Sequence, residues 1–264
     1  MELVGCIALI AVGVILGLTG GGGSVLSLPI LVYLLSVDVI LASAYSFFIV
    51  GTTSIIGVFL KHKDNSIDLK TSLIFGVPSL LAVFLTRKWI VPNIPEIIIA
   101  SESFQITKRE FFLSLIGIVI TLSGIMLLIK FSKQELKPVT ENIFFITAAG
   151  CIVGLLSGLT GIGGGFLILP ALLLLRSIPF KTAVGTTLLI VASNSIIGFI
   201  GDLLSYSIDW IYLVSITGFA VGGIVIGNMS NKIIPVTSLQ KIFSWITFLI
   251  GCFILADEVM QKLS

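Results

Sequence analysis

The chain has 264 residues, of which 56% are hydrophobic and 11% are charged, and its formal net charge is +2. An average soluble domain is about 45–50% apolar and about 25% charged, so this composition excludes a soluble domain and predicts an integral membrane protein in a lipid bilayer. Most Lys and Arg residues lie in short segments between apolar runs, where they report orientation in the membrane, so a nucleic-acid partner is excluded as well.

The first apolar run extends over 35 residues, from Leu3 to Val37, without a charged residue. A straight helix of that length would measure about 52 Å against a hydrocarbon core of about 30 Å, so the run is not one simple crossing. A glycine-rich stretch, GLTGGGGSVLSLP from Gly17 to Pro29, interrupts it, and glycine is a poor helix former. Two half-helices are therefore predicted, Leu3–Leu18 and Ser24–Val37.

The rest of the first half contains three spans, predicted at residues 39–60, 69–85 and 111–129. Arg87 and Lys88 follow the second of them and are interpreted as charges at the membrane boundary. Residues 90–109 are predicted to form a loop or to lie on the membrane surface. In the second half, a broken run and three spans are predicted at residues 142–175, 182–201, 210–231 and 242–256.

The two halves are related in sequence. At a constant offset of 141 residues, residues 12–57 match residues 153–198 without a gap and with 21 identities in 46 positions. The glycine-rich stretch recurs as GLTGIGGGFLILP, from Gly158 to Pro170. We therefore predict an all-α membrane protein with two homologous repeats and a polar linker, at residues 1–131, 142–264 and 132–141.

The distribution of positive charge distinguishes two topologies. If each glycine-broken segment crosses the membrane, the Lys and Arg residues divide 7 against 8 between the two faces. If each segment is re-entrant, each repeat has three crossings and the division is 10 against 5. Because Lys and Arg accumulate on the cytoplasmic side, the second topology is preferred. It makes the repeats inverted and places both termini outside the cytoplasm.

The two glycine clusters are predicted to bind an anion. Successive glycine N–H groups form an anion-binding concavity, and the following half-helix directs its positive end at the same place. Hydroxyl groups of Thr19, Ser24 and Thr160 add donors. The alternative is that the glycines only allow helices to pack closely. The candidate residues are Thr19, Gly20, Gly21, Gly22, Gly23, Ser24, Thr160, Gly161, Gly163, Gly164 and Gly165.

Polar residues in the middle of two long spans form a second candidate surface. They are Thr52, Thr53 and Ser54 in the first repeat and Ser193, Asn194 and Ser195 in the second. Asn194 is the strongest candidate, because an amide is harder to accommodate in an apolar bundle than a hydroxyl that bonds to its own helix. The alternative is that these side chains only join helices to one another.

Enzymatic interpretations are excluded. The only histidine, His62, lies in a basic loop, so a serine hydrolase has no base and a metal site has no second imidazole. Neither glycine cluster is followed by Gly-Lys-Ser/Thr, so no phosphate-binding loop and no cofactor is predicted. Asp38, Asp68, Asp202 and Asp209 lie at segment ends, which gives no obvious proton relay.

The two glycine-rich motifs, together with KTAVGTTLLIVASNSIIG from Lys181 to Gly198, resemble the sulfite exporter TauE/SafE family. The resemblance covers nearly the whole chain. It implies transport of small sulfur-containing anions, such as sulfite or organosulfonates, across the bacterial cytoplasmic membrane.

We therefore predict a multi-pass secondary transporter in the inner membrane that holds an inorganic or organosulfur anion between the two glycine clusters and works by alternating access. An anion channel, with the same donors along a continuous pore, is the alternative. The coupling ion, proton or sodium, and any homo-oligomer are left open. The first repeat has Ser43 to Ser46 where the second has Val184 to Thr187, so the site is expected to be asymmetric.

Overall fold

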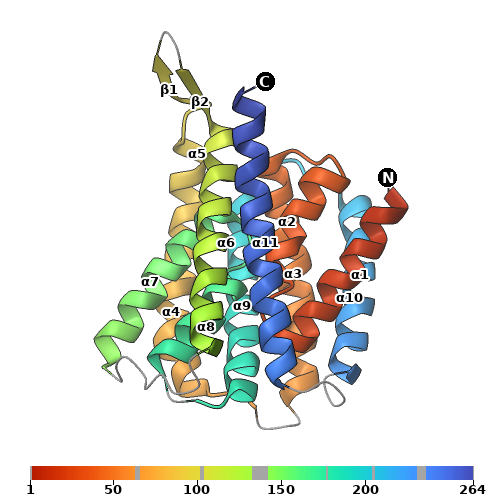
Figure 1. Cartoon of the computed structure of the whole chain (residues 1–264), viewed down its shortest axis with the longest axis vertical. Helices are drawn as coiled ribbons and strands as arrows, with labels where there is room; N and C mark the ends of the chain where they lie inside the picture. Colours follow the sequence, from red (N-terminus) through yellow and green to blue (C-terminus); the bar gives the residue numbers. More distant parts are fainter. Residues whose placement is uncertain are drawn as a thin grey trace.

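The computed structural model describes residues 2–62, 66–101, 104–132, 142–176, 178–203, 206–230 and 236–263. The described part is built almost entirely of helices (Figure 1). In the first half these are α1 (Glu2–Thr19), α2 (Ser24–Pro29), η1 (Ile30–Leu34), α3 (Val39–His62), α4 (Leu69–Leu85), η2 (Thr86–Ile90), α5 (Val91–Asn93) and α6 (Lys108–Ser132). In the second half they are α7 (Ile143–Thr160), α8 (Gly165–Leu175), α9 (Phe180–Leu203), α10 (Trp210–Ser230) and α11 (Val236–Leu263).

The predicted all-α membrane protein is confirmed by the lengths and compositions of these helices. Six of them are long and apolar enough to cross a membrane, at Val39–Lys61, Leu69–Asn93, Lys108–Ile129, Ile143–Thr160, Phe180–Leu203 and Trp210–Ser230. The apolar segments Val4–Thr19, Ser24–Leu34 and Gly165–Leu175 are shorter. Three of the four half-helices predicted from the glycine clusters are therefore too short for a comfortable crossing.

The segment predicted as a loop or surface piece, residues 90–109, contains more structure than expected. It includes α5 and a two-stranded antiparallel hairpin of β1 (Ile97–Ser101) and β2 (Phe104–Thr107). The hairpin projects from the end of the bundle where the C-terminus lies (Figure 1). Most of the predicted linker, residues 133–141, lies outside the described residues.

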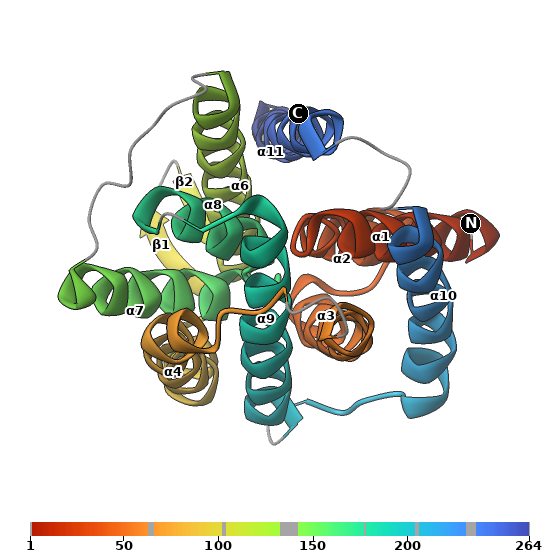
Figure 2. The same cartoon turned by 90° about the horizontal axis from the view of Figure 1, so that it is seen from below.

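Helices from the two halves pair with each other. Viewed along the bundle, α3 and α9 occupy the centre, with α4 and α7 on one side and α1 and α10 on the other (Figure 2). α6 and α11 lie side by side along a third side. Each glycine-broken helix therefore packs against a span of the opposite half.

The contacts between α3 and α9 are symmetric: where a residue of α3 contacts a residue of α9, their counterparts 141 positions away also contact each other. A Cβ on Gly57 would touch Leu188, and one on Gly198 would touch Phe47, its counterpart pair. The two helices are antiparallel, because the contact positions advance along one as they recede along the other. Two packed spans that correspond in sequence thus run in opposite directions.

The helix starts that follow α3 and α9 show the same reciprocity. The N–H of Asp68 donates to Thr186 Oγ1 at 3.0 Å, and the N–H of Asp209 donates to Tyr45 Oη at 3.1 Å. Each of these residues lies 141 positions from its counterpart. The inverted relation of the two repeats stays a prediction, and these reciprocal contacts support it.

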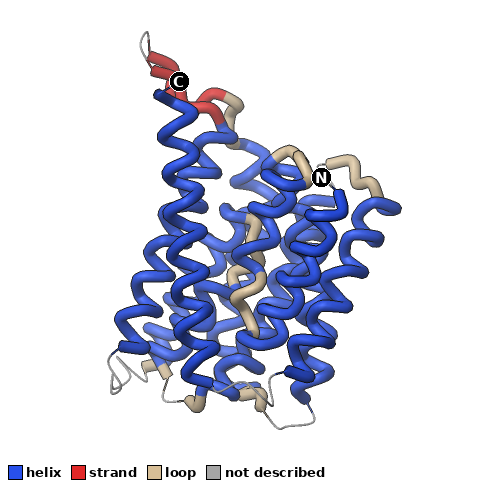
Figure 3. The backbone as a smooth tube through the Cα atoms, turned by 45° about the vertical axis from the view of Figure 1, so that its right-hand side comes forward, coloured by secondary structure: helices blue, strands red, loops and turns tan. Residues whose placement is uncertain are grey.

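The chain between the half-helices runs inside the bundle. We call Gly20–Gly23 the first break and Gly161–Gly164 the second break. Figure 3 shows non-helical chain in the interior, surrounded by helices. The two breaks touch each other, because a Cβ added to Gly165, the residue after the second break, would lie 2.7 Å from the Cα of Gly21.

The charge distribution predicts which end of the bundle faces the cytoplasm. α3 begins beside Arg109, next to the hairpin, so the antiparallel α9 begins at the opposite end. In a variant without cysteines, Gln105→Cys in the hairpin should react with an impermeant maleimide added outside intact cells. Lys181→Cys, exposed at the start of α9, should react only after permeabilisation. Labelling of both positions from the same side would contradict this topology.

Candidate functional site

The second break has a backbone that only glycine adopts readily. Gly161, Gly163 and Gly164 have φ angles of 73°, 71° and 74°, in the left-handed region. Gly161 ends α7, and its N–H donates to the carbonyl of Ser157 at 2.9 Å. In the first break only Gly20 has a positive φ, of 75°. The two breaks therefore differ in conformation although their sequences correspond.

The breaks also differ in how their N–H groups are used. In the first break, the N–H groups of Gly20 and Gly22 donate to Leu16 O at 2.7 Å and to Thr19 Oγ1 at 3.0 Å. From Ile162 in the second break to Phe166 in α8, the N–H groups donate no backbone hydrogen bond within the described ranges. Because N–H groups in an apolar environment require an acceptor, the second break is the better anion-binding concavity.

The three predicted hydroxyl donors bond locally. Thr19 Oγ1 donates to Ile15 O at 2.7 Å, and Ser24 Oγ donates to Gly21 O at 2.6 Å. Thr160 Oγ1 lies 3.4 Å from Ser157 O. These side chains stabilise the ends of the half-helices, and the structure leaves the backbone of the second break as the principal donor.

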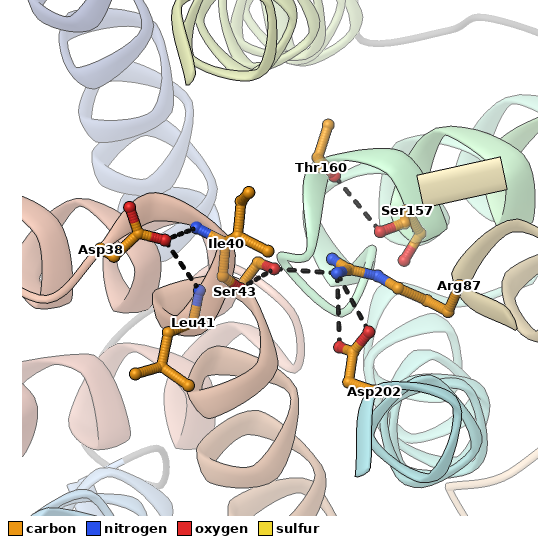
Figure 4. A network of polar contacts seen from close by, with 8 residues as sticks. All are labelled: Asp38, Ile40, Leu41, Ser43, Arg87, Ser157, Thr160 and Asp202. Atoms are coloured by element: carbon orange, nitrogen blue, oxygen red, sulfur yellow. Dashed lines mark hydrogen bonds and ion pairs between the residues drawn. The ribbon is translucent and has the colours of Figure 1, made fainter. Parts of the chain in front are cut away.

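Arg87 is the cation of this region. Its side chain is 0% exposed, and Nη1 donates to Ser43 Oγ at 2.8 Å. Nη1 also lies 3.3–3.4 Å from the carboxylate oxygens of Asp202, which is 1% exposed. The guanidinium carbon lies 4.7 Å from the centre of the Phe47 ring. Figure 4 shows Arg87, Ser43 and Asp202 converging from η2, α3 and α9.

Two side-chain nitrogens of Arg87 make no hydrogen bond to the described residues. Nε and Nη2 are buried and have no hydrogen-bond partner among the described residues. A Cβ on Gly161 would overlap both Nη2 and the Cβ of Ser43, so the guanidinium lies directly against the second break. A buried cation with unused donors and a row of unpaired N–H groups thus face the same part of the interior.

Local structure explains why Arg87 is buried. Residues 86–90 form a π-helical turn, η2, which widens the helix by one residue and changes the direction of the side chains that follow. Arg87 turns inward, while Lys88 is exposed and its ammonium lies over the rings of Phe84 and Trp89. Arg87 and Lys88, adjacent in the sequence, therefore lie in different surroundings, a difference that the sequence interpretation did not make.

The prediction that Asp202 lies at a segment end is confirmed, because Asp202 is next to the last residue of α9. Its burial against Arg87 was not predicted. In the topology with three crossings per repeat, Arg87 and Asp202 each lie at the end of a span, on the same side of the membrane. Opposite charges at equal depth were the signal in the sequence that could have identified this pair.

Buried hydroxyls line the second break on both sides. A Cβ on Gly163 would lie 2.7 Å from Ser195 Oγ, and one on Gly164 would lie 2.7 Å from Ser157 Oγ. Both hydroxyls lack a hydrogen-bond partner within the part of the chain that the structure describes. Ser195 belongs to the second surface predicted from the sequence, whereas Ser157 was not predicted as a site residue.

The second predicted surface divides into two kinds of side chain. Thr53 Oγ1 donates to Ile49 O at 2.7 Å and Ser193 Oγ donates to Leu189 O at 3.0 Å, so both bond to their own helices. Thr52 is half-buried. Asn194 Nδ2 donates to Ser79 Oγ at 2.7 Å and joins α9 to α4.

Asn194 retains one unused group. Its Oδ1 is buried and without a partner among the described residues. The structure therefore supports the helix-joining interpretation for the amide nitrogen of Asn194. The carbonyl oxygen is an acceptor, and it does not add to the anion-binding donors.

Comparisons with known proteins agree with this architecture. The family model described as sulfite exporter TauE/SafE matches residues 5–254. The chain belongs to this family. Probable membrane transporter protein YunE of Bacillus subtilis (strain 168) is 24% identical and covers 97% of the chain and 99% of its own length. Probable membrane transporter protein MJ0441 of Methanocaldococcus jannaschii is 30% identical over 94% of each chain. No solved structure matches.

The family membership and the six candidate spans make the protein a multi-pass membrane transporter. The names of the relatives describe transporters, which agrees with the exclusion of enzymatic activity. Within the described residues, no cluster of three or more His, Cys, Asp or Glu side chains is placed to hold a metal ion.

Proposed function

We propose that the protein is a secondary transporter of a small sulfur-containing anion, sulfite or an organosulfonate, which binds at the second break beside Arg87. The observation that carries this proposal is the fully buried guanidinium whose Nε and Nη2 have no partner and whose Nη2 lies against Gly161. A sulfur oxyanion has several oxygens at the spacing that a guanidinium and successive N–H groups recognise.

Charge supports an anion in this place. A buried cation is costly unless it is paired and hydrogen-bonded. Asp202 contacts Nη1 alone, so the Nε and Nη2 edge of Arg87 is free to donate hydrogen bonds to two oxygens of a ligand. The N–H groups of residues 162–166 and the start of α8 then supply further donors and the positive end of a helix dipole.

The first break does not offer the same set of groups, which favours one anion per chain. At the offset of 141 residues, the counterparts of Ser43, Arg87 and Asp202 are Val184, Asn228 and Lys61. Contact between Gly21 and Gly165 brings the first break directly against the start of α8. In the proposed cycle, relative movement of the two halves at this contact exposes the second break alternately to the two sides of the membrane.

An anion screen tests the proposal. Sulfite, methanesulfonate, taurine and sulfate are added to the purified protein in detergent, and the melting temperature is recorded. A ligand at a hundred times its Kd should stabilise the native state by about 2.7 kcal/mol. We expect sulfite or a sulfonate to raise the melting temperature, whereas no effect from any sulfur anion would contradict the proposal.

Flux measurements then distinguish a carrier from a channel. In proteoliposomes, uptake of labelled anion should saturate, and unlabelled anion inside the vesicles should accelerate uptake of the label by exchange. Exchange requires a site that returns loaded, which a continuous pore does not provide. Flux that is linear in concentration and insensitive to internal anion would favour the anion channel instead.

A further inference from the structure

The Arg87–Asp202 pair carries an inference about the coupling ion, which rests on the function proposed above. Asp202 is buried, and both of its carboxylate oxygens lie within 3.4 Å of Nη1 of Arg87. Arg87 is the one ion-pair partner that the structure gives Asp202 among the described residues. The charges of the pair cancel, so the empty site is neutral overall.

An arriving anion disturbs this balance. An oxyanion bound to Nε and Nη2 shares a single guanidinium with the carboxylate of Asp202, so two negative charges face one positive charge. In an interior from which water is excluded, such an uncompensated negative charge is costly. Protonation of Asp202 removes the excess charge and leaves the guanidinium to the anion.

The surroundings of Asp202 contain few other groups that could accept that proton. The elements that pack against the end of α9 contribute no charged side chain from residues 71–85 of α4 or from α8. Lys88 in η2 lies over two aromatic rings. Asp38 caps α3 by accepting from the N–H of Ile40, away from the pair (Figure 4).

Another titratable group, Tyr206, lies close to Asp202. Glu96, which also acts on Tyr206, is exposed and lies 3.8 Å from the ammonium of Lys108. Burial, and then the charge of Asp202, raise the pKa of the Tyr206 phenol, and the N–H of Tyr206 donates to the carbonyl of Asp202 at 3.1 Å. A phenol is neutral at physiological pH and so neither adds charge to the site nor accepts a proton there. Asp202 is therefore the group of the site whose protonation state responds to the anion.

We propose that Asp202 takes up one proton from water each time a monoanion binds to Arg87, so that the protein moves anion and proton together in the same direction. An O–H bond forms on the carboxylate, and the Arg87–Asp202 ion pair is replaced by an Arg87–anion pair. Release of the anion reverses both changes. The site is neutral in both states, so transport of a monoanion is electroneutral.

Proton uptake in solution tests this coupling. Methanesulfonate and sulfite are each titrated calorimetrically into wild-type protein in buffers with different ionisation enthalpies, which gives the number of protons bound per anion. We expect about one proton per methanesulfonate, and a Kd that rises about tenfold per pH unit above the pKa of the site. Asp202→Asn should bind methanesulfonate without proton uptake and with a Kd independent of pH.

Asp209→Asn is the matched control. Asp209 also lies at a segment end of the same half, where it caps α10, and asparagine preserves that cap. This variant should take up as many protons as the wild type. Proton uptake that persists in Asp202→Asn, or that is lost in Asp209→Asn, would overturn the assignment. Sulfite itself exchanges protons with the buffer. For sulfite, the proton uptake of Asp202→Asn is therefore subtracted from that of the wild type.

Flux through the wild-type protein provides a readout that does not depend on the folding of a variant. In proteoliposomes with a clamped membrane potential, methanesulfonate uptake should follow an imposed pH gradient. If only sulfite binds, sulfite uptake is measured instead. For methanesulfonate, a change in potential should have no effect. Uptake driven by potential and unaffected by pH would refute the coupling and leave the anion site intact. If neither anion binds, it is the proposed function that fails.

Discussion

Replacing Arg87 by glutamine is expected to abolish anion binding and to destabilise the protein. The substitution removes the buried cation and leaves the carboxylate of Asp202 without its partner. Loss of one member of a buried ion pair typically costs about 3–5 kcal/mol, which for a chain of this size lowers the melting temperature by roughly 10 °C. Melting in detergent and equilibrium binding of labelled sulfite measure the two effects separately.

A double variant separates binding from folding. Arg87→Gln combined with Asp202→Asn removes both charges together, so most of the lost stability should return. Binding should not return, because the guanidinium is still absent. Arg87→Lys keeps the charge but loses the planar fork, and we expect it to bind at least tenfold more weakly than the wild type.

Lys88→Gln is the control for charge at this depth of the membrane. The side chain is adjacent in sequence, exposed and stacked over aromatic rings, so its replacement should change sulfite affinity by less than twofold. Wild-type affinity in the double variant, or equal losses in Arg87→Gln and Lys88→Gln, would show that Arg87 does not hold the anion.

The second large effect is expected for Gly161→Ala. A left-handed φ of 73° strains any residue with a Cβ by about 1–2 kcal/mol. The new methyl group would also overlap Ser43 and Arg87, and overpacking of this kind adds about 1–3 kcal/mol. We expect a large loss of stability, together with displacement of the guanidinium and loss of sulfite binding.

Gly218→Ala is the matched control because it makes the same change in a helix with free space. No atom lies within 4 Å of a Cβ at Gly218 in α10, so this variant should be neutral or stabilised by up to about 1 kcal/mol. Adding Ser43→Gly to Gly161→Ala should recover part of the stability, since it removes one of the two overlaps. A Gly161→Ala protein as stable as Gly218→Ala would refute the packing described for the second break.

Much of the fold follows from the sequence because its signals are local. The excess of apolar residues, the charge-free runs and the two glycine clusters predict membrane helices with two interruptions, and the structure has them. The hairpin of β1 and β2 was not predicted, because the prolines at 92 and 95 favoured a loop. The isoleucine run from Ile97 to Ile99 was the β-forming signal.

The candidate site was only partly predictable, because its decisive features depend on tertiary structure. The glycine clusters were predicted to form the site. Arg87 was not, because it is turned inward by a π-helical turn that no sequence pattern indicates. The difference between the breaks also depends on single substitutions. At the offset of 141, Gly165 stands in place of Ser24, whose hydroxyl closes the first break onto Gly21 O, and the second break stays open.

Selenite, the selenium analogue of sulfite, locates the bound anion most directly. Crystals of a variant with Cys6, Cys151 and Cys252 replaced by alanine, which removes thiols that selenite would oxidise, are soaked with selenite and examined for anomalous scattering from selenium. We expect a peak within hydrogen-bond distance of Arg87 Nη2 and of the N–H groups of the second break. A peak confined to the first break, or none in a protein that binds selenite in solution, would contradict the central claim.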